Sequence, residues 1–323
     1  KKTIIHPALK NVSRIADVVM KKDIMLHFPY HSFNAVIDLL REAAMDPQVL
    51  EIKITAYRLA PNSKIINALI NARRNEKKVT VMLELRARFD EEANLEWKER
   101  LEDEGVQVLM GVPGMKVHAK LCIIKRKQGN KMIQYGFIST GNCNEKTATQ
   151  YGDHCLLTAN RYVMADISRI FKYLTQPKTG AHFLKACKTL MVSPLTMRKQ
   201  LTALISHEIK NAKNGKPAGI LLKLNSLSDE ALINKLYEAA YAGVEIRMVI
   251  RGICCMITEN KKFRGTVQAI SIVDEYLEHA RVMIFHNGGR QKVMISSADL
   301  MVRNLDHRVE AATYIKDPAI CNE

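Results

Sequence analysis

Two short stretches of the chain place a histidine two residues before a cationic side chain. His118 and Lys120 stand in "KVHAKL", and His279 and Arg281 stand in "YLEHARV". A neutral imidazole is a good nucleophile near pH 7, and a neighbouring cation can neutralise phosphoryl oxygens as charge develops on them. A single strand histidine is more often a satisfied or solvated residue than a catalyst. These stretches therefore favour phosphoryl transfer only if the rest of the chain supports it.

The first stretch has the alternation of a β-strand. Read with a period of two, Lys116, His118 and Lys120 fall on one face, and Val117 and Ala119 fall on the other. We expect the apolar face to pack and the basic face to look outward.

The net charge of the chain limits the classes of partner that it is expected to bind. Lys and Arg total 49 against 33 Asp and Glu, so the net charge is +16. Such an excess predicts attraction to nucleic acid, anionic lipid or phosphate chains. Aromatic residues make up only 6% and do not interleave with basic runs, so base stacking is poorly supported and we expect no nucleic-acid partner. We interpret the basic run 125–131 as a solvated hairpin that can also steer a polyanion.

Other features concern location. We expect no transmembrane segment, because no apolar run approaches the roughly 18 residues that span a bilayer, and no secretory signal. Seven cysteines without a C-x-x-C motif indicate reduced thiols in a cytosol. The first residues are Lys-Lys rather than Met, from which we expect an excised piece of a longer protein.

Strand-like and helix-like stretches alternate in the first half. Residues 50–58 and 79–86 have the pattern of buried strands, 62–78 that of a helix beginning at an Asn or Ser cap, and 91–105 that of a helix ended by Gly105. This alternation predicts an α/β fold with mostly parallel, mixed sheets flanked by helices.

The second half repeats the first. Strand-like 218–224 and 244–251 enclose a helical stretch, and Arg251 at the end of the second strand matches Arg86. "HAK" is answered by "HAR", and "STGN" (139–142) by "SSAD" (296–299). Four matched elements in one order indicate internal duplication. We predict two domains, 1–180 and 181–323, each presenting one histidine.

A duplicated α/β unit with H-x-K and a small polar turn resembles the phospholipase D superfamily. The resemblance implies two phospholipase D-like domains whose motifs meet at a pseudo-twofold axis, one histidine attacking phosphorus and the other serving as an acid. Hydrolases of that superfamily usually carry an Asp five residues after the lysine, where this chain has Lys125, and Arg281 replaces the second lysine. These departures argue against phosphodiesterase activity.

Longer motifs resemble one family much more closely. The chain contains "FPYHSF", "EIKITAYRLA", "ARFDEEAN", "GMKVHAKL", "STGNCNEKTA", "ISIVDEYLEHARV" and "IFHNGG". Together they resemble the two carboxy-terminal catalytic domains of bacterial polyphosphate kinases. The resemblance implies reversible transfer of the ATP γ-phosphate to inorganic polyphosphate, through a phosphohistidine and with Mg²⁺.

The same resemblance assigns roles to residues. His118 matches the phosphorylated histidine, and His279 the second catalytic histidine, which contacts the nucleotide. Tyr151 in "QYGDH" and Arg251 in "VIRG" match ATP-contacting positions. A buried core tyrosine is the alternative for Tyr151.

Further residues are expected around the phosphates. Arg58 and Arg88 match positions that the family associates with magnesium, and since a guanidinium only donates, we expect them to act through phosphate or backbone. Lys120 and Arg281 are expected to bind phosphate oxygens. Asn142 either bonds the phosphoryl group or forms the turn.

Three functions remain open on these grounds. The first is polyphosphate kinase, with ATP, ADP and polyphosphate as partners, a homo-oligomeric complete protein, and a bacterial cytoplasmic location that includes peripheral association with the inner membrane. The second is a phospholipase D-like phosphodiesterase acting on nucleic acid or lipid, and the third a non-catalytic polyanion-binding module. In the kinase family an additional amino-terminal domain helps to hold the nucleotide base, so we expect this chain alone to be impaired.

Overall fold

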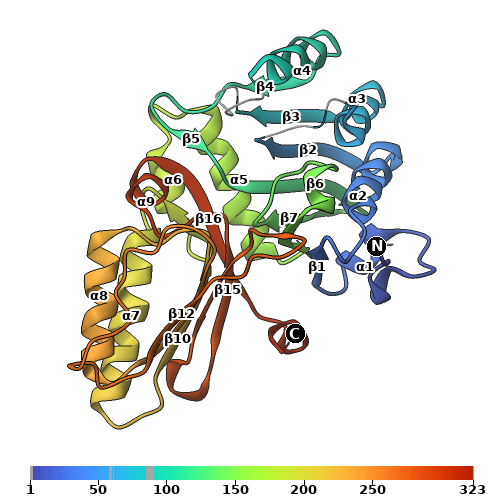
Figure 1. Cartoon of the computed structure of the whole chain (residues 1–323). Helices are drawn as coiled ribbons and strands as arrows, with labels where there is room; N and C mark the ends of the chain where they lie inside the picture. Colours follow the sequence, from blue (N-terminus) through green and yellow to red (C-terminus); the bar gives the residue numbers. More distant parts are fainter. Residues whose placement is uncertain (1–2, 58–59, 61, 85–90, 323) are drawn as a thin grey trace. The chain divides into compact units, whose positions relative to one another are not determined.

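The computed structural model describes residues 3–57, 60, 62–84 and 91–322, and Figure 1 shows the course of the chain. The chain divides into two compact units, Lys1–Thr189 and Leu190–Glu323. The predicted limits 1–180 and 181–323 stay a prediction. Arg58 and Arg88 lie outside the described residues.

The first unit is a sheet with helices on both faces. Its strand order is β1-β8-β7-β6-β2-β3-β4. Helices α2 and α3 share the main core of the unit with β2 and β3, and α5 packs on β6 and β7. The strands are β1 (Ile24–Phe28), β2 (Val49–Ala56), β3 (Lys78–Leu83), β4 (Gln107–Leu109), β5 (Lys116–Val117), β6 (Lys120–Gln128), β7 (Lys131–Ser139) and β8 (Tyr151–Thr158), and the helices are α1 (Ile15–Val19), α2 (Asn34–Met45), α3 (Lys64–Arg74), α4 (Glu91–Asp103), α5 (Arg161–Thr175) and α6 (Ala181–Lys185).

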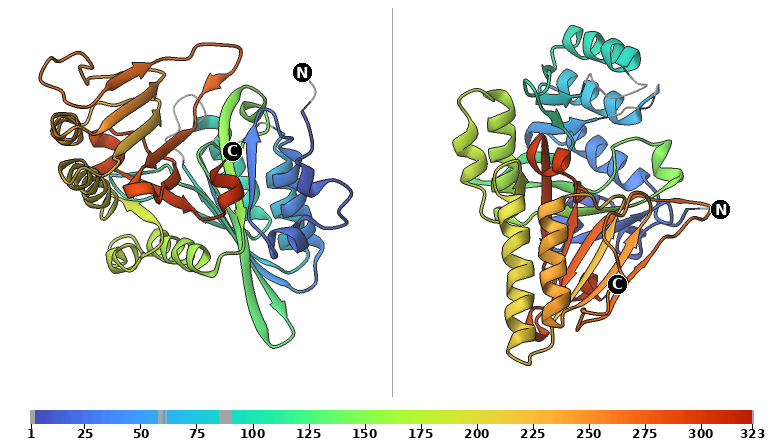
Figure 2. Two further views of the ribbon diagram at one scale, coloured as in Figure 1. Left: turned by 90° about the horizontal axis from the view of Figure 1, so that it is seen from below. Right: turned by 60° about the vertical axis from the view of Figure 1, so that its left-hand side comes forward.

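The second unit repeats this plan. Its strand order is β9-β16-β15-β14-β10-β11-β12, which matches the first unit strand by strand. Helices α7 and α8 lie together against one face of its sheet (Figure 2). The strands are β9 (Met191–Ser193), β10 (Gly219–Leu224), β11 (Glu245–Ile250), β12 (Val267–Ile270), β13 (Leu277–Glu278), β14 (Arg281–Phe285), β15 (Lys292–Ser296) and β16 (Arg308–Ile315), and the helices are α7 (Met197–Lys213), α8 (Glu230–Ala242), α9 (Val302–Asp306) and α10 (Pro318–Cys321).

Local signals explain where the helices begin and end. The Ser63 hydroxyl accepts the N–H of Ile66 and caps α3, as predicted. Asp229 caps α8 in the same way, and Gly243 follows that helix with φ 99°, a conformation that glycine adopts without strain.

The sheets are mixed, as predicted, but the expectation that they are mostly parallel was wrong. Among the strands of each unit whose pairing is described, β2–β3–β4 and β10–β11–β12 pair in parallel, and the other pairs are antiparallel. The reason lies in short hairpins that the alternation of strands and helices does not reveal. Residues 286–291, for example, connect β14 directly to β15.

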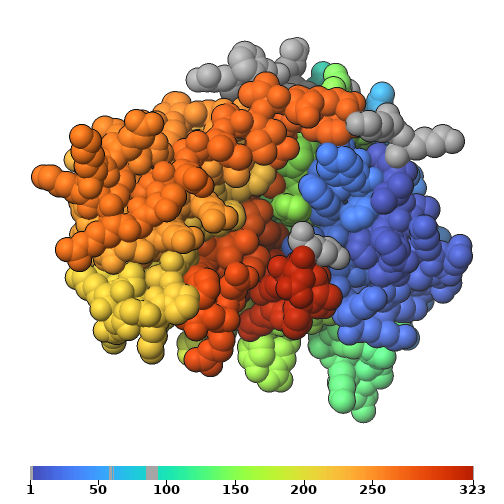
Figure 3. All heavy atoms as spheres, turned by 60° about the horizontal axis from the view of Figure 1, so that its bottom comes forward, coloured from blue at the N-terminus to red at the C-terminus, as the bar shows by residue number. Residues whose placement is uncertain are grey.

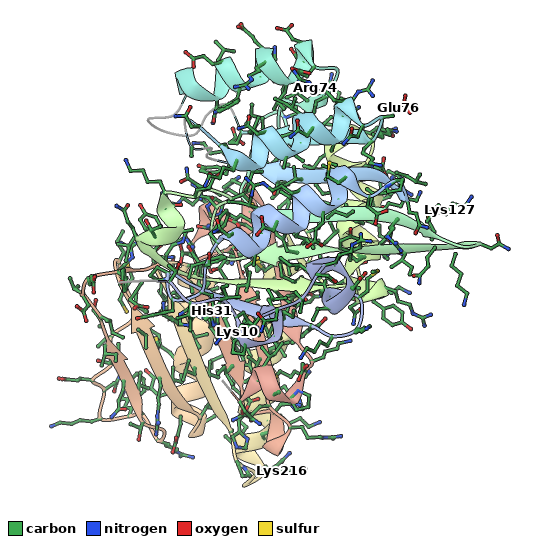
Figure 4. All side chains as sticks on the ribbon, turned by 90° about the vertical axis from the view of Figure 1, so that its right-hand side faces the viewer. Lys10, His31, Arg74, Glu76, Lys127 and Lys216 are labelled. Atoms are coloured by element: carbon green, nitrogen blue, oxygen red, sulfur yellow. The ribbon has the colours of Figure 1, made fainter. Side chains whose placement is uncertain are left out.

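The β6–β7 hairpin carries the basic run 125–131 to its tip. Lys127 lies at the free end (Figure 4), and the hairpin protrudes from the surface (Figure 3, green). The nine residues of β6 rise about 3.3 Å each, so the far end of the strand is roughly 26 Å from Lys120. Residues 127–131 form the solvated hairpin that the sequence predicted, at the far end of β6 from His118, whereas the side chain of Arg126 is 11% exposed and pairs with Asp46.

One finding concerns membranes. No helix in the described part of the chain combines the length and the apolar character that crossing a bilayer requires.

Candidate active site

His118 sits between β5 and β6 and is buried, with 8% exposure. The Tyr57 ring meets the imidazole edge-on, with ring centroids 5.1 Å apart. The Thr55 hydroxyl donates to the carbonyl of Ala119 at 2.7 Å and accepts the N–H of Leu121 at 2.9 Å. The end of β2 therefore fixes the backbone that carries His118.

Lys120 is buried too, with 1% exposure. Its Nζ lies 5.5 Å from the centroid of the Tyr57 ring, within range of a cation–π contact. The expectation that this basic face looks outward was wrong, because the face of β6 that carries Lys120 continues with Cys122 and Ile124 into the core shared with α2 and α3.

Glu84 holds the chain on the other side of His118. Its carboxylate accepts the N–H of Val117 at 3.0 Å, and its own carbonyl accepts a hydrogen bond from Asn94 at 2.9 Å. Hydrogen bonds with the side chains of Thr55 and Glu84 thus hold the backbone on both sides of His118, so the position of this residue is fixed before any substrate binds.

The "STGN" turn follows β7. The Thr140 hydroxyl donates to Asp153 at 2.6 Å, and the Ser139 hydroxyl accepts the N–H of Gly141 at 3.2 Å. A Cβ on Gly141 would lie 2.1 Å from the Asp153 carboxylate, so the turn requires glycine there. Asn142 Oδ1 is buried and, among the described residues, has no hydrogen-bond partner.

Two neighbours of Asn142 have structural roles. Asn144 Oδ1 accepts the N–H groups of Lys146 and Thr147, each at 3.0 Å, so this side chain forms the turn. Burial, with a smaller contribution from the charge of Glu145, raises the pKa of the Cys143 thiol to about 12, so Cys143 is not a thiolate at neutral pH.

The second unit builds a charged network around His279. The Arg281 guanidinium pairs with Asp299, Nη2 to Oδ2 at 3.0 Å and Nε to Oδ1 at 3.3 Å. Arg281 Nη1 donates to the carbonyl of His279 at 2.9 Å. Asn225 Nδ2 donates to the same carbonyl at 3.0 Å, and Asn225 Oδ1 accepts from Arg251 Nε at 2.9 Å.

Asp299 is ionised in this network. Burial alone would raise its pKa, but the charge and hydrogen bonds of Arg281 and the N–H groups of Asn225 and Ser226 outweigh burial and hold the pKa below its ordinary value. Arg281 and Asp299 therefore form an ion pair inside the second unit.

Strand pairing shows which residues of the two units correspond. Pairing along β2, β3 and β6 and along β10, β11 and β14 places Glu84 and Arg251 at equivalent positions. The predicted match of Arg86 with Arg251 was therefore wrong by two residues, because similar letters aligned out of strand register. Pairing with β7 and β15 makes Asn142 equivalent to Asp299, as the match of "STGN" with "SSAD" predicted.

The predicted site residues therefore fall into two groups within their own units. In the first unit, His118 and Lys120 surround Tyr57, while Tyr151 is half-buried at the start of β8, two residues before Asp153. In the second unit, Arg251, His279 and Arg281 belong to one hydrogen-bonded network.

Sequence reasoning missed the groups that hold the predicted residues in place. They are Thr55, Tyr57, Glu84, Asp153, Asn225 and Asp299. Asp299 had a signal in its match with Asn142 in the repeat, and Thr55, Tyr57 and Asp153 lie inside the quoted motifs "EIKITAYRLA" and "QYGDH".

One finding concerns metal ligands among the described residues. Within them, no cluster of three or more His, Cys, Asp or Glu side chains could hold a metal ion. Mg²⁺ bound together with nucleotide phosphates needs only one or two protein ligands, so it does not require such a cluster.

The duplicated sheet with paired H-x-K and H-x-R motifs defines an α/β protein with two units of one plan, the architecture that the resemblance to the phospholipase D superfamily implied. The phosphatidylserine synthase of Haemophilus influenzae matches with a TM-score of 0.59 at 10% identity, over 92% of this chain and 83% of that chain, a likeness of fold alone.

Family models then give the particular family. The model for polyphosphate kinase C-terminal domain 1 matches residues 14–180, and the model for C-terminal domain 2 matches residues 190–323. The chain belongs to the polyphosphate kinase family, as the motifs predicted. Polyphosphate kinase of Salmonella typhimurium is 48% identical over 94% of this chain and 44% of its own length.

A solved structure agrees. Polyphosphate kinase of Porphyromonas gingivalis matches with a TM-score of 0.90 and 39% identity, over 100% of this chain and 49% of that chain. The chain thus spans less than half the length of these relatives.

Proposed function

We propose that this chain carries the phosphoryl-transfer chemistry of a polyphosphate kinase, the reversible transfer of the ATP γ-phosphate to inorganic polyphosphate. The supporting observation is that family models cover both units, together with a buried histidine beside a buried lysine in the first unit. The relatives are named polyphosphate kinases, and the transfer from ATP through a phosphohistidine is what the resemblance of the motifs implies.

In the proposed first step, a nitrogen of neutral His118 attacks the γ-phosphorus. An N–P bond forms, the bond from the γ-phosphorus to the bridging oxygen breaks, and ADP leaves with that oxygen. In the second step a terminal oxygen of polyphosphate attacks the same phosphorus, the N–P bond breaks, and the imidazole is restored.

The other residues would stabilise charge. Lys120 neutralises phosphoryl oxygens, and Asn142, whose Oδ1 is buried, orients the group through its amide. His279 and Arg251 contact the phosphates of the nucleotide, and Tyr151 the nucleotide. Arg58 and Arg88 would bind phosphate oxygens, and Mg²⁺ would enter with the nucleotide and neutralise its charge.

Labelling with γ-³²P-ATP tests the proposal. The protein should acquire an acid-labile, base-stable label that chases into polyphosphate. His118→Ala should abolish the label, whereas His182→Ala, which removes an exposed histidine of the same unit, should not.

Each opposite outcome is informative. Full labelling of His118→Ala would remove His118 from the reaction. Cleavage of a phosphodiester without labelling from ATP would favour the phosphodiesterase instead, and binding without either reaction would favour the polyanion-binding module.

A further inference from the structure

Asp299 is the centre of the network around His279. It is 6% exposed. Oδ2 accepts from Arg281, and Oδ1 accepts from Arg281 Nε and from the N–H groups of Asn225 at 2.7 Å and Ser226 at 3.2 Å. Four donors on fixed groups therefore surround this carboxylate.

Arg281 is likewise buried and hydrogen-bonded within the second unit. It is 4% exposed, and each of its three nitrogens has an acceptor within the unit: Nε and Nη2 bond Asp299, and Nη1 bonds the carbonyl of His279. Nη1 also lies 3.2 and 3.4 Å from the two ring nitrogens of His279. The position of a guanidinium held in this way is fixed by the protein and not by a bound substrate.

Asn225 extends the network to a second arginine. Its backbone N–H is held by Asp299, and its side chain joins the His279 carbonyl to Arg251. A shift of Asp299 would therefore reach both predicted nucleotide-contacting residues of this unit.

We propose that Asp299 is a positioning residue that fixes His279 and Arg251 through Arg281 and Asn225, and that Arg281 belongs to this clamp rather than to the phosphate-binding groups. The inference rests on the proposed function and departs from the expectation that Arg281 binds phosphate oxygens.

Comparison of the two repeated units supports the assignment of Arg281 to the clamp. In the first unit Lys120 and Asn142 stand where Arg281 and Asp299 stand in the second. An amide carries no charge, so the pair of Lys120 and Asn142 does not neutralise itself as Arg281 and Asp299 do. Arg281 is therefore paired with a carboxylate at a position where the first unit has the uncharged amide of Asn142.

The test uses Asp299→Asn, Arg281→Lys and the double variant in the complete protein. Tripolyphosphate affinity is measured by calorimetry and turnover with ATP by steady-state kinetics. Asp299→Asn and Arg281→Lys should each lower kcat at least tenfold and should change the tripolyphosphate Kd by similar factors, within twofold of each other, because either change displaces His279 and Arg251. The kcat of the double variant should be little lower than that of either single variant, because both changes break the same clamp.

A phosphate-binding Arg281 predicts the reverse. Arg281→Lys would then raise the tripolyphosphate Kd at least tenfold more than Asp299→Asn does, and the two effects would add in the double variant. That result would overturn the proposal, as would unchanged kcat in both single variants. If Asp299→Asn does not fold, Asn225→Ala, which leaves the ion pair intact, should lower kcat and raise the KM for ATP, and no change in either would refute the clamp.

Modification of His279 by diethylpyrocarbonate, mapped by peptide mass, separates this proposal from the proposed function. A protein without any turnover from ATP would disprove the kinase. Asp299→Asn should still speed the modification of His279 several-fold if the clamp exists, and an unchanged rate would contradict it.

Discussion

Asp46 links three separate parts of the first unit, and its replacement by Asn should weaken that unit measurably. Its side chain is 3% exposed and accepts hydrogen bonds from Arg14, which precedes α1, and from Arg126 on β6, the latter at 2.8 Å. The N–H of Gln48 also donates to it, at 2.8 Å.

The depressed pKa of Asp46 gives the size of the expected loss of stability. Burial alone would raise the pKa of Asp46, but the hydrogen bonds from Arg126, Arg14 and Gln48 outweigh it and lower the pKa from 3.8 to about 2. One pKa unit corresponds to about 1.4 kcal/mol, so ionisation of Asp46 stabilises the folded unit by about 2 kcal/mol at neutral pH. Because the folded-state pKa is depressed, this stability is present above pH 3.8 and is lost as the pH falls through 2.

Urea denaturation followed by the fluorescence of Trp97 provides the assay. Trp97 is the only tryptophan of the chain and lies in the core of the first unit with 5% exposure, so it reports that unit. Asp46→Asn should lower the free energy of unfolding by about 2 kcal/mol at pH 7 and by only about 1 kcal/mol at pH 3, where the unfolded chain has largely bound its proton.

A matched control separates this effect from the loss of any carboxylate. Asp38 pairs with Arg41 on the surface, with 46% side-chain exposure, and Asp38→Asn should not change the unfolding curve. Equal stability of Asp46→Asn and wild type at pH 7, or a difference that stays the same down to pH 3, would refute the reasoning.

Three further predictions concern packing, capping and charge. Gly136→Ala places a Cβ 2.0 Å from the carbonyl oxygen of Cys122, so calorimetry should show a loss of about 2 kcal/mol or more, whereas Gly219→Ala, whose nearest contact is 3.7 Å, should be mild; equal melting temperatures would contradict this. Ser63→Ala removes the cap of α3 and should cost about 1 kcal/mol by the Trp97 assay, and an unchanged midpoint would show that the cap does not contribute. Polyphosphate affinity should fall steeply with salt, and Lys127→Ala should change kcat less than twofold because the hairpin tip lies about 26 Å along β6 from Lys120, several Debye lengths at physiological salt; a tenfold loss of kcat would place the hairpin in the site.

Patterns within a few residues were enough to predict several helix ends, a hairpin and the correspondence of the two repeats. The cap at Ser63, the helix end at Gly105, the hairpin at 125–131 and the correspondence of "STGN" with "SSAD" depend on neighbours in the chain, and the structure confirms them. The family was accessible for the same reason, since its motifs are continuous strings of residues.

Properties that depend on distant residues were not accessible. Whether Lys120 faces solvent or core depends on which helices cover its sheet, and strand register alone shows that Arg251 corresponds to Glu84.

The repeated strands, the two histidine motifs and the family can be read from the order of the amino acids, because each is encoded by continuous or periodic residues. The ion pair of Arg281 with Asp299 and the link through Asn225 from Arg251 to His279 exist only in the folded chain. Asn225 and Asp299 are 74 positions apart in the chain, and pairing of β10 with β14 and of β14 with β15 brings them within hydrogen-bond distance. Hydrogen bonds and ion pairs act over a few ångströms, so their partners are set by strand pairing and not by spacing along the chain.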